Sequence, residues 1–199
     1  LGNGSNEILE LAARAFLNPG SSAVASAHAF VVYKIVTQSS GATLIEVPTL
    51  NWGHNLVEFP EHVRDDTKVI FIANPNNPTG TYNSHQEVHS LLKNIPSSIL
   101  VVLDCAYFEY VKKSDYVNPL ALLNEFDNLI VTKSFSKIQG LASARIGYGI
   151  AQPDLIEVLN RIRQPFNVNS FAQELACEAI NDKEHIQQSI ELNLSEGDF

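Results

Sequence analysis

Short runs of β-branched and apolar residues alternate with segments of helical periodicity along most of the chain, and this alternation limits the possible folds most strongly. Residues 68–73 (Lys-Val-Ile-Phe-Ile-Ala) and 99–104 (Ile-Leu-Val-Val-Leu-Asp) are typical of buried strands. Residues 6–17 and 83–94 carry apolar side chains at helical spacing. Such strand–helix alternation predicts an α/β domain with a mostly parallel sheet and helices on both faces.

The same two patterns predict the remaining elements. Strands are expected at 23–27, 42–47, 128–132 and 144–150, and helices at 30–38, 119–126, 153–163, 171–181 and 184–194. We expect residues 1–183 to form one large domain. The more polar residues 184–199 are expected to begin a second, smaller domain, which would make the chain a fragment of a longer protein.

Composition excludes several classes of protein. With 199 residues, of which 45% are hydrophobic, the chain is long enough to bury its own core. Its 22 acidic and 13 basic residues give a net charge of −9, which argues against a nucleic-acid-binding protein. Two cysteines, Cys105 and Cys177, are too few for a disulfide-rich secreted scaffold. No run is long and apolar enough to span a membrane and no signal segment is evident, so we expect a cytoplasmic protein.

In parallel sheets, ligands bind beyond the carboxyl ends of the strands, so the residues that follow each strand are the candidate site. One further motif precedes the first helix, where residues 2–7 read Gly-Asn-Gly-Ser-Asn-Glu. Glycines allow close approach of a ligand, and free N–H groups at a helix N-terminus bind phosphate. An ordinary capped helix start would carry the same residues, with Ser5 or Asn6 as the cap.

Two motifs follow the strongest predicted strands. Residues 74–80 read Asn-Pro-Asn-Asn-Pro-Thr-Gly, and two prolines would make this turn rigid enough to direct an asparagine amide at a ligand. Asp104 ends the next strand, and a partly buried carboxylate needs a cationic or donor partner, such as a protonated ring nitrogen. Tyr107 lies three residues further on and is expected to direct its hydroxyl at the same ligand. A plain turn and a structural aspartate are the alternative interpretations.

The last motif is Thr-Lys-Ser-Phe-Ser-Lys at residues 132–137, followed by Arg145. Lys137 has few charged neighbours, and we expect partial desolvation to make its amine a nucleophile toward an aldehyde. Arg145 offers the planar guanidinium that suits a phosphate. A solvated lysine and a surface arginine are the alternatives.

Together these motifs resemble those of the fold-type I, pyridoxal-phosphate-dependent aminotransferases. The residues that carry the resemblance are Asn-Pro-Asn-Asn-Pro-Thr-Gly at 74–80, Asp-Cys-Ala-Tyr at 104–107, and Ser-Phe-Ser-Lys at 134–137 with Arg145 eight residues later. Within them, the opening motif and Pro-Phe-Asn-Val-Asn at 165–169 are most similar to the histidinol-phosphate aminotransferases. The resemblance covers nearly the whole chain and implies that residues 1–183 are the cofactor-binding large domain.

The resemblance implies a role for each candidate residue. Lys137 would bind pyridoxal 5'-phosphate covalently and act as the general base, and Asp104 would keep the ring nitrogen protonated. Asn77 and Tyr107 would bind the ring oxygen, and Phe30 would stack on the ring. The phosphate-binding residues would be Gly4, Ser5, Asn6, Ser134 and Arg145, with Ser136 close by.

The implied reaction converts L-histidinol phosphate and 2-oxoglutarate into imidazole acetol phosphate and L-glutamate, a step of histidine biosynthesis. The resemblance also implies a homodimer, with small-molecule amine and 2-oxo acid substrates and neither nucleic acid nor membrane as a partner. A threonine-phosphate-type decarboxylase and another amino-acid aminotransferase remain alternatives of the same fold. A non-catalytic cofactor-binding sensory domain of a transcription regulator is an alternative of another class.

A metal site is not expected. His85 and His89 stand four residues apart on a predicted helix, a spacing that suits zinc, but no third ligand is evident. We interpret both as residues of a solvated helix face.

Overall fold

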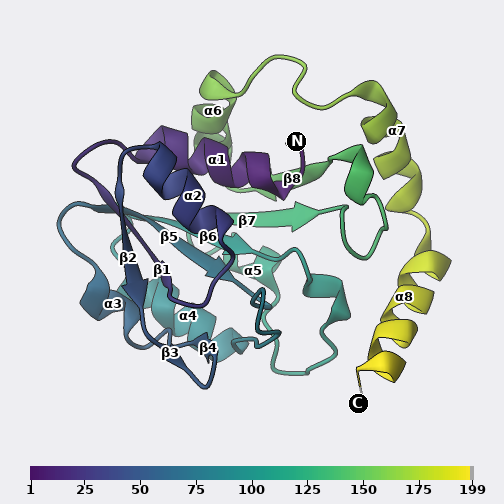
Figure 1. The fold of residues 1–199 in the computed structure, drawn as a ribbon, viewed down its shortest axis with the longest axis horizontal. Helices are drawn as coiled ribbons and strands as arrows, with labels where there is room; N and C mark the ends of the chain where they lie inside the picture. The colour runs from purple at the N-terminus through teal and green to yellow at the C-terminus, as the bar shows by residue number, and fades with distance from the viewer. Residues whose placement is uncertain (198–199) are drawn as a thin grey trace.

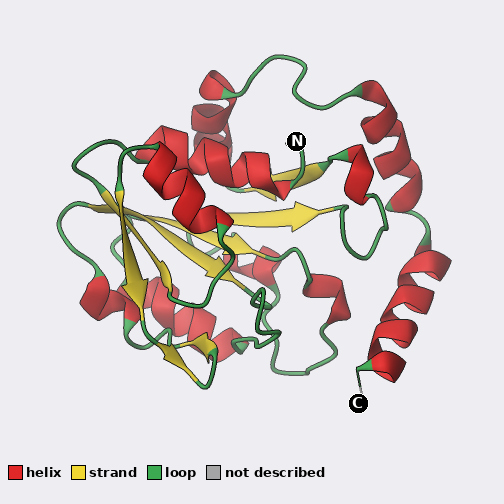
Figure 2. Ribbon diagram, viewed as in Figure 1, coloured by secondary structure: helices red, strands yellow, loops and turns green. Residues whose placement is uncertain are grey.

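The computed structural model describes residues 1–197 as a six-stranded sheet covered by helices, as Figures 1 and 2 show. The strands lie in the order β2-β1-β5-β6-β7-β8. Their bounds are Ser22–Ser26 (β1), Thr43–Val47 (β2), Thr67–Ala73 (β5), Leu100–Asp104 (β6), Leu129–Ser134 (β7) and Gly147–Ile150 (β8). Neighbouring strands are parallel except β7 and β8, which are antiparallel. The predicted α/β class with a mostly parallel sheet is therefore confirmed.

Helices cover both faces of the sheet because the central strands are apolar on both sides. Val69 and Phe71 of β5 face one hydrophobic cluster, which includes residues of α1 (Ser5–Phe16), α2 (Val32–Ser39) and α6 (Pro153–Ile162). Ile70 and Ile72 face the other, which includes residues of α3 (Phe59–His62), α4 (His85–Asn94) and α5 (Pro119–Leu122). Alternate residues of one strand thus fill two separate cores, as the period of two in a strand requires.

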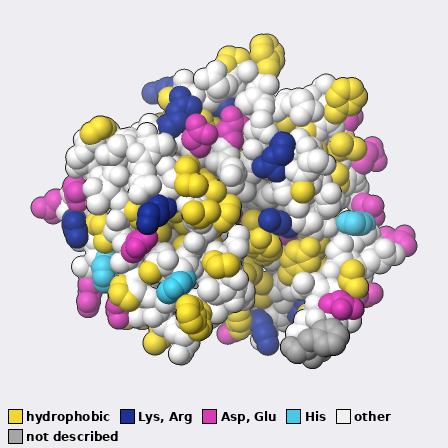
Figure 3. All heavy atoms as spheres, in the orientation of Figure 1, with side chains coloured by type: hydrophobic (Ala, Val, Ile, Leu, Met, Phe, Trp, Pro, Cys, Tyr) yellow, Lys and Arg dark blue, Asp and Glu magenta, His cyan; other side chains and the backbone are white. Residues whose placement is uncertain are grey.

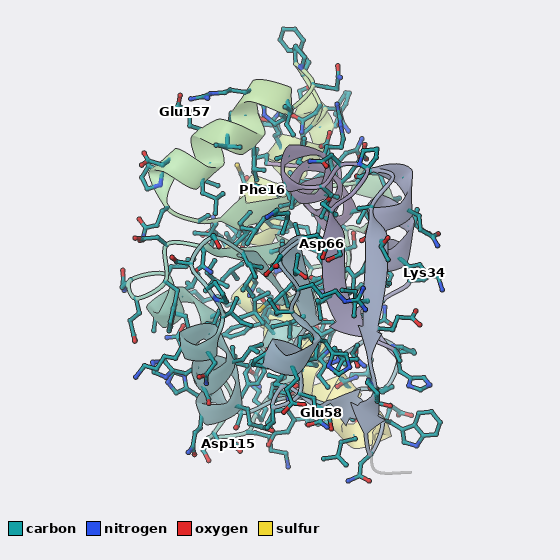
Figure 4. The ribbon with its side chains drawn as sticks, turned by 90° about the vertical axis from the view of Figure 1, so that its left-hand side faces the viewer. Phe16, Lys34, Glu58, Asp66, Asp115 and Glu157 are labelled. Carbon is teal, nitrogen blue, oxygen red and sulfur yellow. The ribbon has the colours of Figure 1, made fainter. Side chains whose placement is uncertain are left out.

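The surface helices direct their charges outward. Figure 4 shows the side chains of Lys34 on α2 and Glu157 on α6 pointing away from the sheet. Two further helices, α7 (Ser170–Ala179) and α8 (Lys183–Glu196), follow α6 and run along one side of the molecule (Figure 1). The last two residues of the expected 184–199 segment lie outside the described residues. In the part of the chain that is described, no helix has the length and apolar character needed to cross a membrane.

Two local predictions were wrong, and one element was missed. The strand expected at 144–150 begins only at Gly147, because Ala142–Ala144 form a 3-10 turn (η2) and Arg145 is left-handed at φ 55°. The helix expected at 119–126 ends at Leu122; the carbonyl of Leu123 accepts a hydrogen bond from the side chain of Gln152 instead (2.6 Å). The hairpin of β3 (Thr49–Leu50) and β4 (Gly53–His54) was not predicted.

Helix α4 begins with a capping box. Ser84 Oγ accepts from the backbone N–H of Glu87, and the Glu87 carboxylate accepts from the backbone N–H of Ser84 at 2.8 Å. Two otherwise unpaired donors of the first turn are thereby satisfied.

Loss of this cap should destabilise the fold. We expect Ser84→Ala to lower the free energy of unfolding by about 1 kcal/mol, measured by urea denaturation. Ser90→Ala, at an exposed position of the same helix, is the control and should change it by less than about 0.5 kcal/mol. Equal effects of the two substitutions would contradict a capping role for Ser84.

His54 gives the fold a dependence on pH. Burial lowers the pKa of its imidazole to about 4, although Nε2 lies 2.9 Å from the carbonyl oxygen of Ala73, an interaction that raises the pKa. An unfolded chain, with a histidine pKa of about 6.5, therefore binds a proton that the folded chain excludes.

Stability should fall as the pH decreases from about 6.5 to 4, by up to about 3 kcal/mol from this residue. We expect His54→Gln to flatten that part of the stability–pH curve, measured by urea denaturation at several pH values. His85→Gln, at an exposed position, is the control and should leave the slope unchanged. A slope that survives in His54→Gln would assign the effect to other groups.

Candidate functional site

The carboxyl ends of three neighbouring parallel strands meet at one edge of the sheet. Ala73 of β5 pairs with Asp104 of β6, and Asp104 pairs with Thr132 of β7. A cavity of about 120 Å³ opens at this edge. Every site residue predicted from the sequence lines it except Gly4: Ser5, Asn6, Phe30, Asn77, Asp104, Tyr107, Ser134, Ser136, Lys137 and Arg145.

Gly4 lies just behind the cavity wall, where its lack of a side chain is required. It precedes α1 with φ 74°, and a Cβ there would overlap the guanidinium of Arg145. Gly147 of β8 has the same property, since a Cβ would overlap the backbone of Gly4 and Ser5. Close approach of α1, β8 and Arg145 therefore depends on these two glycines.

Hydrogen-bond donors surround the part of the cavity that is lined by Arg145 and the start of α1. Arg145 Nη1 donates to Ser136 Oγ at 3.2 Å and to the carbonyl of Ala142 at 2.8 Å, which fixes the guanidinium. Ser5 forms the first turn of a twelve-residue helix, where N–H groups have no helical acceptor. Hydroxyls, a guanidinium and a helix N-terminus are the donor set that binds a phosphate group.

Asp104 is buried at the floor of the cavity, with 5% of its surface exposed. Its Oδ1 accepts from Thr132 Oγ1 at 2.9 Å, and its Oδ2 accepts from Tyr33 Oη at 3.0 Å. Burial raises the pKa of this carboxyl, while the two hydroxyls and the backbone N–H of Ala106 lower it. Within residues 1–197, Asp104 has no salt-bridge partner, so the carboxylate is available to a cation in the cavity.

Lys137 lies in the turn that follows β7. Its Nζ lies 4.9 Å from the centre of the Tyr107 ring, and its carbonyl accepts from the backbone N–H of Gly140. The sequence predicted partial desolvation of this amine, which was wrong: Lys137 is an exposed residue at the cavity wall. Its amine is therefore accessible from the cavity.

The 74–80 loop is held by its own asparagines. Asn74 exchanges two hydrogen bonds with the backbone of Asn83, at 2.9 and 3.0 Å. Asn76 Nδ2 donates to the carbonyl of His28 at 2.7 Å, two residues before Phe30. The peptide bonds Asn74–Pro75 and Asn77–Pro78 are cis. The asparagine hydrogen bonds fix the backbone just before Asn77, as a directed amide requires.

A wider groove of about 670 Å³ adjoins the cavity and shares Pro75, Asn77, Tyr107 and Lys137 with it. Its remaining lining residues include Tyr82 and Tyr110, two further lysines, Lys112 and Lys113, and Asn193 and Leu194 of α8. Figure 3 shows hydrophobic side chains in the middle of one face of the molecule, with acidic side chains mostly towards its margins. A second molecule that approaches the Lys137 amine has room in this groove.

Sequence reasoning missed two residues of the site, Tyr33 and Thr132. Tyr33 is fully buried in α2, and its ring stacks on Phe71 at 5.0 Å. In the sequence, Tyr33 fits a core helix face. Thr132 opens the 132–137 motif but also fits the end of a buried strand, so neither residue was given a role. Their hydroxyls reach Asp104 through the register of β6 and β7 and the placement of α2 on the sheet, which only the tertiary structure shows.

His85 and His89 lie on α4, away from the cavity. Their rings stack at 5.6 Å, and His89 Nε2 lies 2.9 Å from a carboxylate oxygen of Glu125. Among the described residues, no group of three potential metal ligands was found.

Comparison with known proteins agrees with this geometry. The family model of aminotransferase class I and II matches residues 1–196. Histidinol-phosphate aminotransferase 2 of Pseudomonas fluorescens is 52% identical over 193 residues, which are 97% of this chain and 52% of that protein. The chain therefore spans about half the length of the curated relatives it matches.

Two solved structures have the same fold. Histidinol-phosphate aminotransferase from Sinorhizobium meliloti, in complex with pyridoxal-5'-phosphate, is 26% identical with a TM-score of 0.92, over 98% of this chain and 53% of that one. L-threonine-O-3-phosphate decarboxylase from Porphyromonas gingivalis is 25% identical with a TM-score of 0.79, over 93% of this chain and 56% of that one. These similarities confirm the predicted fold-type I architecture, and the chain belongs to the aminotransferase class I and II family.

Proposed function

We propose that this chain is the cofactor-binding part of a pyridoxal-5'-phosphate-dependent aminotransferase. One observation carries the proposal: the Lys137 amine and the buried, cation-free carboxylate of Asp104 line one cavity whose other end is rich in phosphate donors. An aldehyde-bearing pyridinium phosphate has complementary groups at these points. The donor set and the glycine-dependent closeness of α1 and Arg145 fit that cofactor.

Each site residue predicted from the sequence has a role in this proposal. Arg145, Ser134, Ser136 and the α1 start with Gly4, Ser5 and Asn6 hold the phosphate. Asn77 and Tyr107 donate to the ring oxygen, and Phe30 covers the ring. Asp104 would accept a hydrogen bond from the protonated ring nitrogen and so keep that nitrogen cationic.

The chemistry follows from the charge that Asp104 stabilises. When bound, the cofactor withdraws electrons from the substrate carbon that bears the amine. Lys137 would hold the cofactor covalently through Nζ and, as a free amine, would serve as the general base for the proton on that carbon. Lys137 lines both the cavity and the groove, so its amine is accessible from both.

We further propose L-histidinol phosphate and 2-oxoglutarate as substrates, with L-glutamate and imidazole acetol phosphate as products. This supports a role in histidine biosynthesis and rests on the named relatives, which reach 52% identity. A decarboxylase is the second candidate, favoured by the threonine-phosphate decarboxylase that has the same fold. Release of carbon dioxide without formation of glutamate would support the decarboxylase.

We propose that residues 1–183 are the large domain and that α8 begins the small one. Only Ile190 of α8 is buried among the described residues, which suits a helix that packs against further structure.

A homodimer is also proposed, with Phe166 in the contact: its side chain is 96% exposed at φ 58°, and nearby Phe171 is 82% exposed. The two cysteines form no disulfide, which supports a cytoplasmic location.

Removal of the Lys137 amine should abolish covalent attachment of the cofactor. We expect Lys137→Ala, incubated with pyridoxal phosphate, to lack the visible absorbance of the lysine-bound cofactor. Any transamination should fall by at least about 10²-fold, measured as glutamate formed from 2-oxoglutarate. Lys93→Ala, at an exposed position of α4, is the control and should match the unaltered chain. An unchanged spectrum in Lys137→Ala would refute this role.

Removal of the Asp104 charge should affect turnover more than binding. Asp104→Asn keeps the shape of the side chain but cannot stabilise a cationic ring nitrogen. We expect it to retain visible absorbance while transamination falls by about 10²-fold or more. Asp127→Asn, at an exposed position, is the control. Near-normal turnover in Asp104→Asn would show that the ring nitrogen needs no charge from this residue.

A further inference from the structure

Two hydroxyl groups from different elements hold the two oxygens of Asp104. Tyr33 Oη of α2 donates to Oδ2 at 3.0 Å, and Thr132 Oγ1 of β7 donates to Oδ1 at 2.9 Å. Tyr33 is 1% exposed and Thr132 is fully buried. Neither residue lines the cavity, so both act on Asp104 from behind it.

The Tyr33 hydroxyl is fixed by the packing of its ring. The ring stacks on Phe71 of β5 at 5.0 Å with an angle of 6°, and meets the edge of Phe30 at 5.9 Å. The Tyr33 carbonyl also accepts from Thr37 Oγ1 at 2.7 Å, which anchors this turn of α2. The ring therefore has no room to turn its hydroxyl away from Asp104.

Thr132 is fixed by the sheet. It lies opposite Asp104 in the parallel register of β6 and β7, and its hydroxyl reaches across to the carboxylate. The backbone N–H of Ala106 supplies a third donor. Each oxygen of the carboxylate therefore accepts a hydrogen bond from a residue behind it. The remaining open side of the carboxylate faces the cavity that it lines.

We propose that Tyr33 and Thr132 are positioning residues that keep Asp104 ionised and directed at a cationic ring nitrogen of the bound cofactor. This inference rests on the proposed function. Hydrogen bonds to a charged acceptor favour its charged form, and they strengthen in a buried site. Without one of them, Asp104 binds its own proton more tightly and stabilises the charge of the ring nitrogen less.

The position of Tyr33 also links two functions of one segment. Phe30, which lines the cavity, lies two residues before α2, and Tyr33 lies in its first turn; their rings meet edge to face at 5.9 Å. Helix α2 packs over the sheet through Tyr33 and Val36. The ring that would cover the cofactor and the hydroxyl that supports its acid are therefore placed by one short segment, the residues that lead into α2 and its first turn.

The test uses Tyr33→Phe, which removes the hydroxyl and keeps the stacked ring, and Thr132→Val, which removes the other hydroxyl at similar volume. Each chain is loaded with pyridoxal phosphate that carries a heavy-nitrogen label in its ring. Nuclear magnetic resonance then follows protonation of that nitrogen across the pH range in which the protein is folded. We expect the nitrogen to bind its proton about tenfold less tightly in each variant.

Three controls separate positioning from structure. Thr132→Ser retains the hydroxyl and should restore the titration of the unaltered chain. Tyr148→Phe removes a tyrosine hydroxyl outside the cavity and should not change it. A cofactor analogue with a ring carbon in place of the nitrogen should bind equally to all chains, because it has no charge for Asp104 to stabilise.

The outcomes are distinct. The titration of the ring nitrogen in Tyr33→Phe and Thr132→Val could match that of the unaltered chain with its cofactor bound to Lys137. That result would overturn the inference and leave the proposed function intact. Equal loss of affinity for the ring-carbon analogue would also overturn it, since the role would then be structural. If the unaltered chain does not bind the cofactor, both proposals fail. If Tyr33→Phe does not fold, the comparison of Thr132→Val with Thr132→Ser decides the matter.

Discussion

A buried carboxylate with no salt-bridge partner among residues 1–197 is the constraint on which this structure depends. Asp104 lies at the end of the central strand β6, where burial removes the water that would otherwise solvate its charge. The fold compensates with donors from α2, β7 and the backbone, and leaves one side of the carboxylate facing the cavity. A buried acid that is supported by neutral donors is suited to receive a positive charge from a ligand.

The rest of the site is arranged relative to that acid. Parallel strands bring the 74–80 loop, Asp104 and the Lys137 turn to one edge of the sheet. Arg145 lies just before the antiparallel strand β8 and meets the start of α1, and Gly4 and Gly147 permit the contact. Anion donors, acid and amine thus occupy separate parts of one cavity, although they are spread over most of the chain.

The sequence was most informative where local pattern and local structure coincide. Strand β5 and helix α4 could be predicted because periodicity and the Ser84 cap are local properties. The end of α5 could not, because a distant side chain, Gln152, takes the carbonyl of Leu123. The hairpin with Asn51 and Trp52 at positive φ was missed because neither residue is the glycine that such turns usually contain.

The same distinction explains the candidate site. Residues in the motifs were placed at the cavity because loops after parallel strands must meet there. Tyr33 was overlooked because an aromatic residue on a helix face has an adequate explanation in the core, and it does stack on Phe71. Its hydroxyl acquires a function only through a contact with Asp104, 71 positions further along the chain. Tyr33 acts through another side chain, and the tertiary contact, not the local sequence, identifies it.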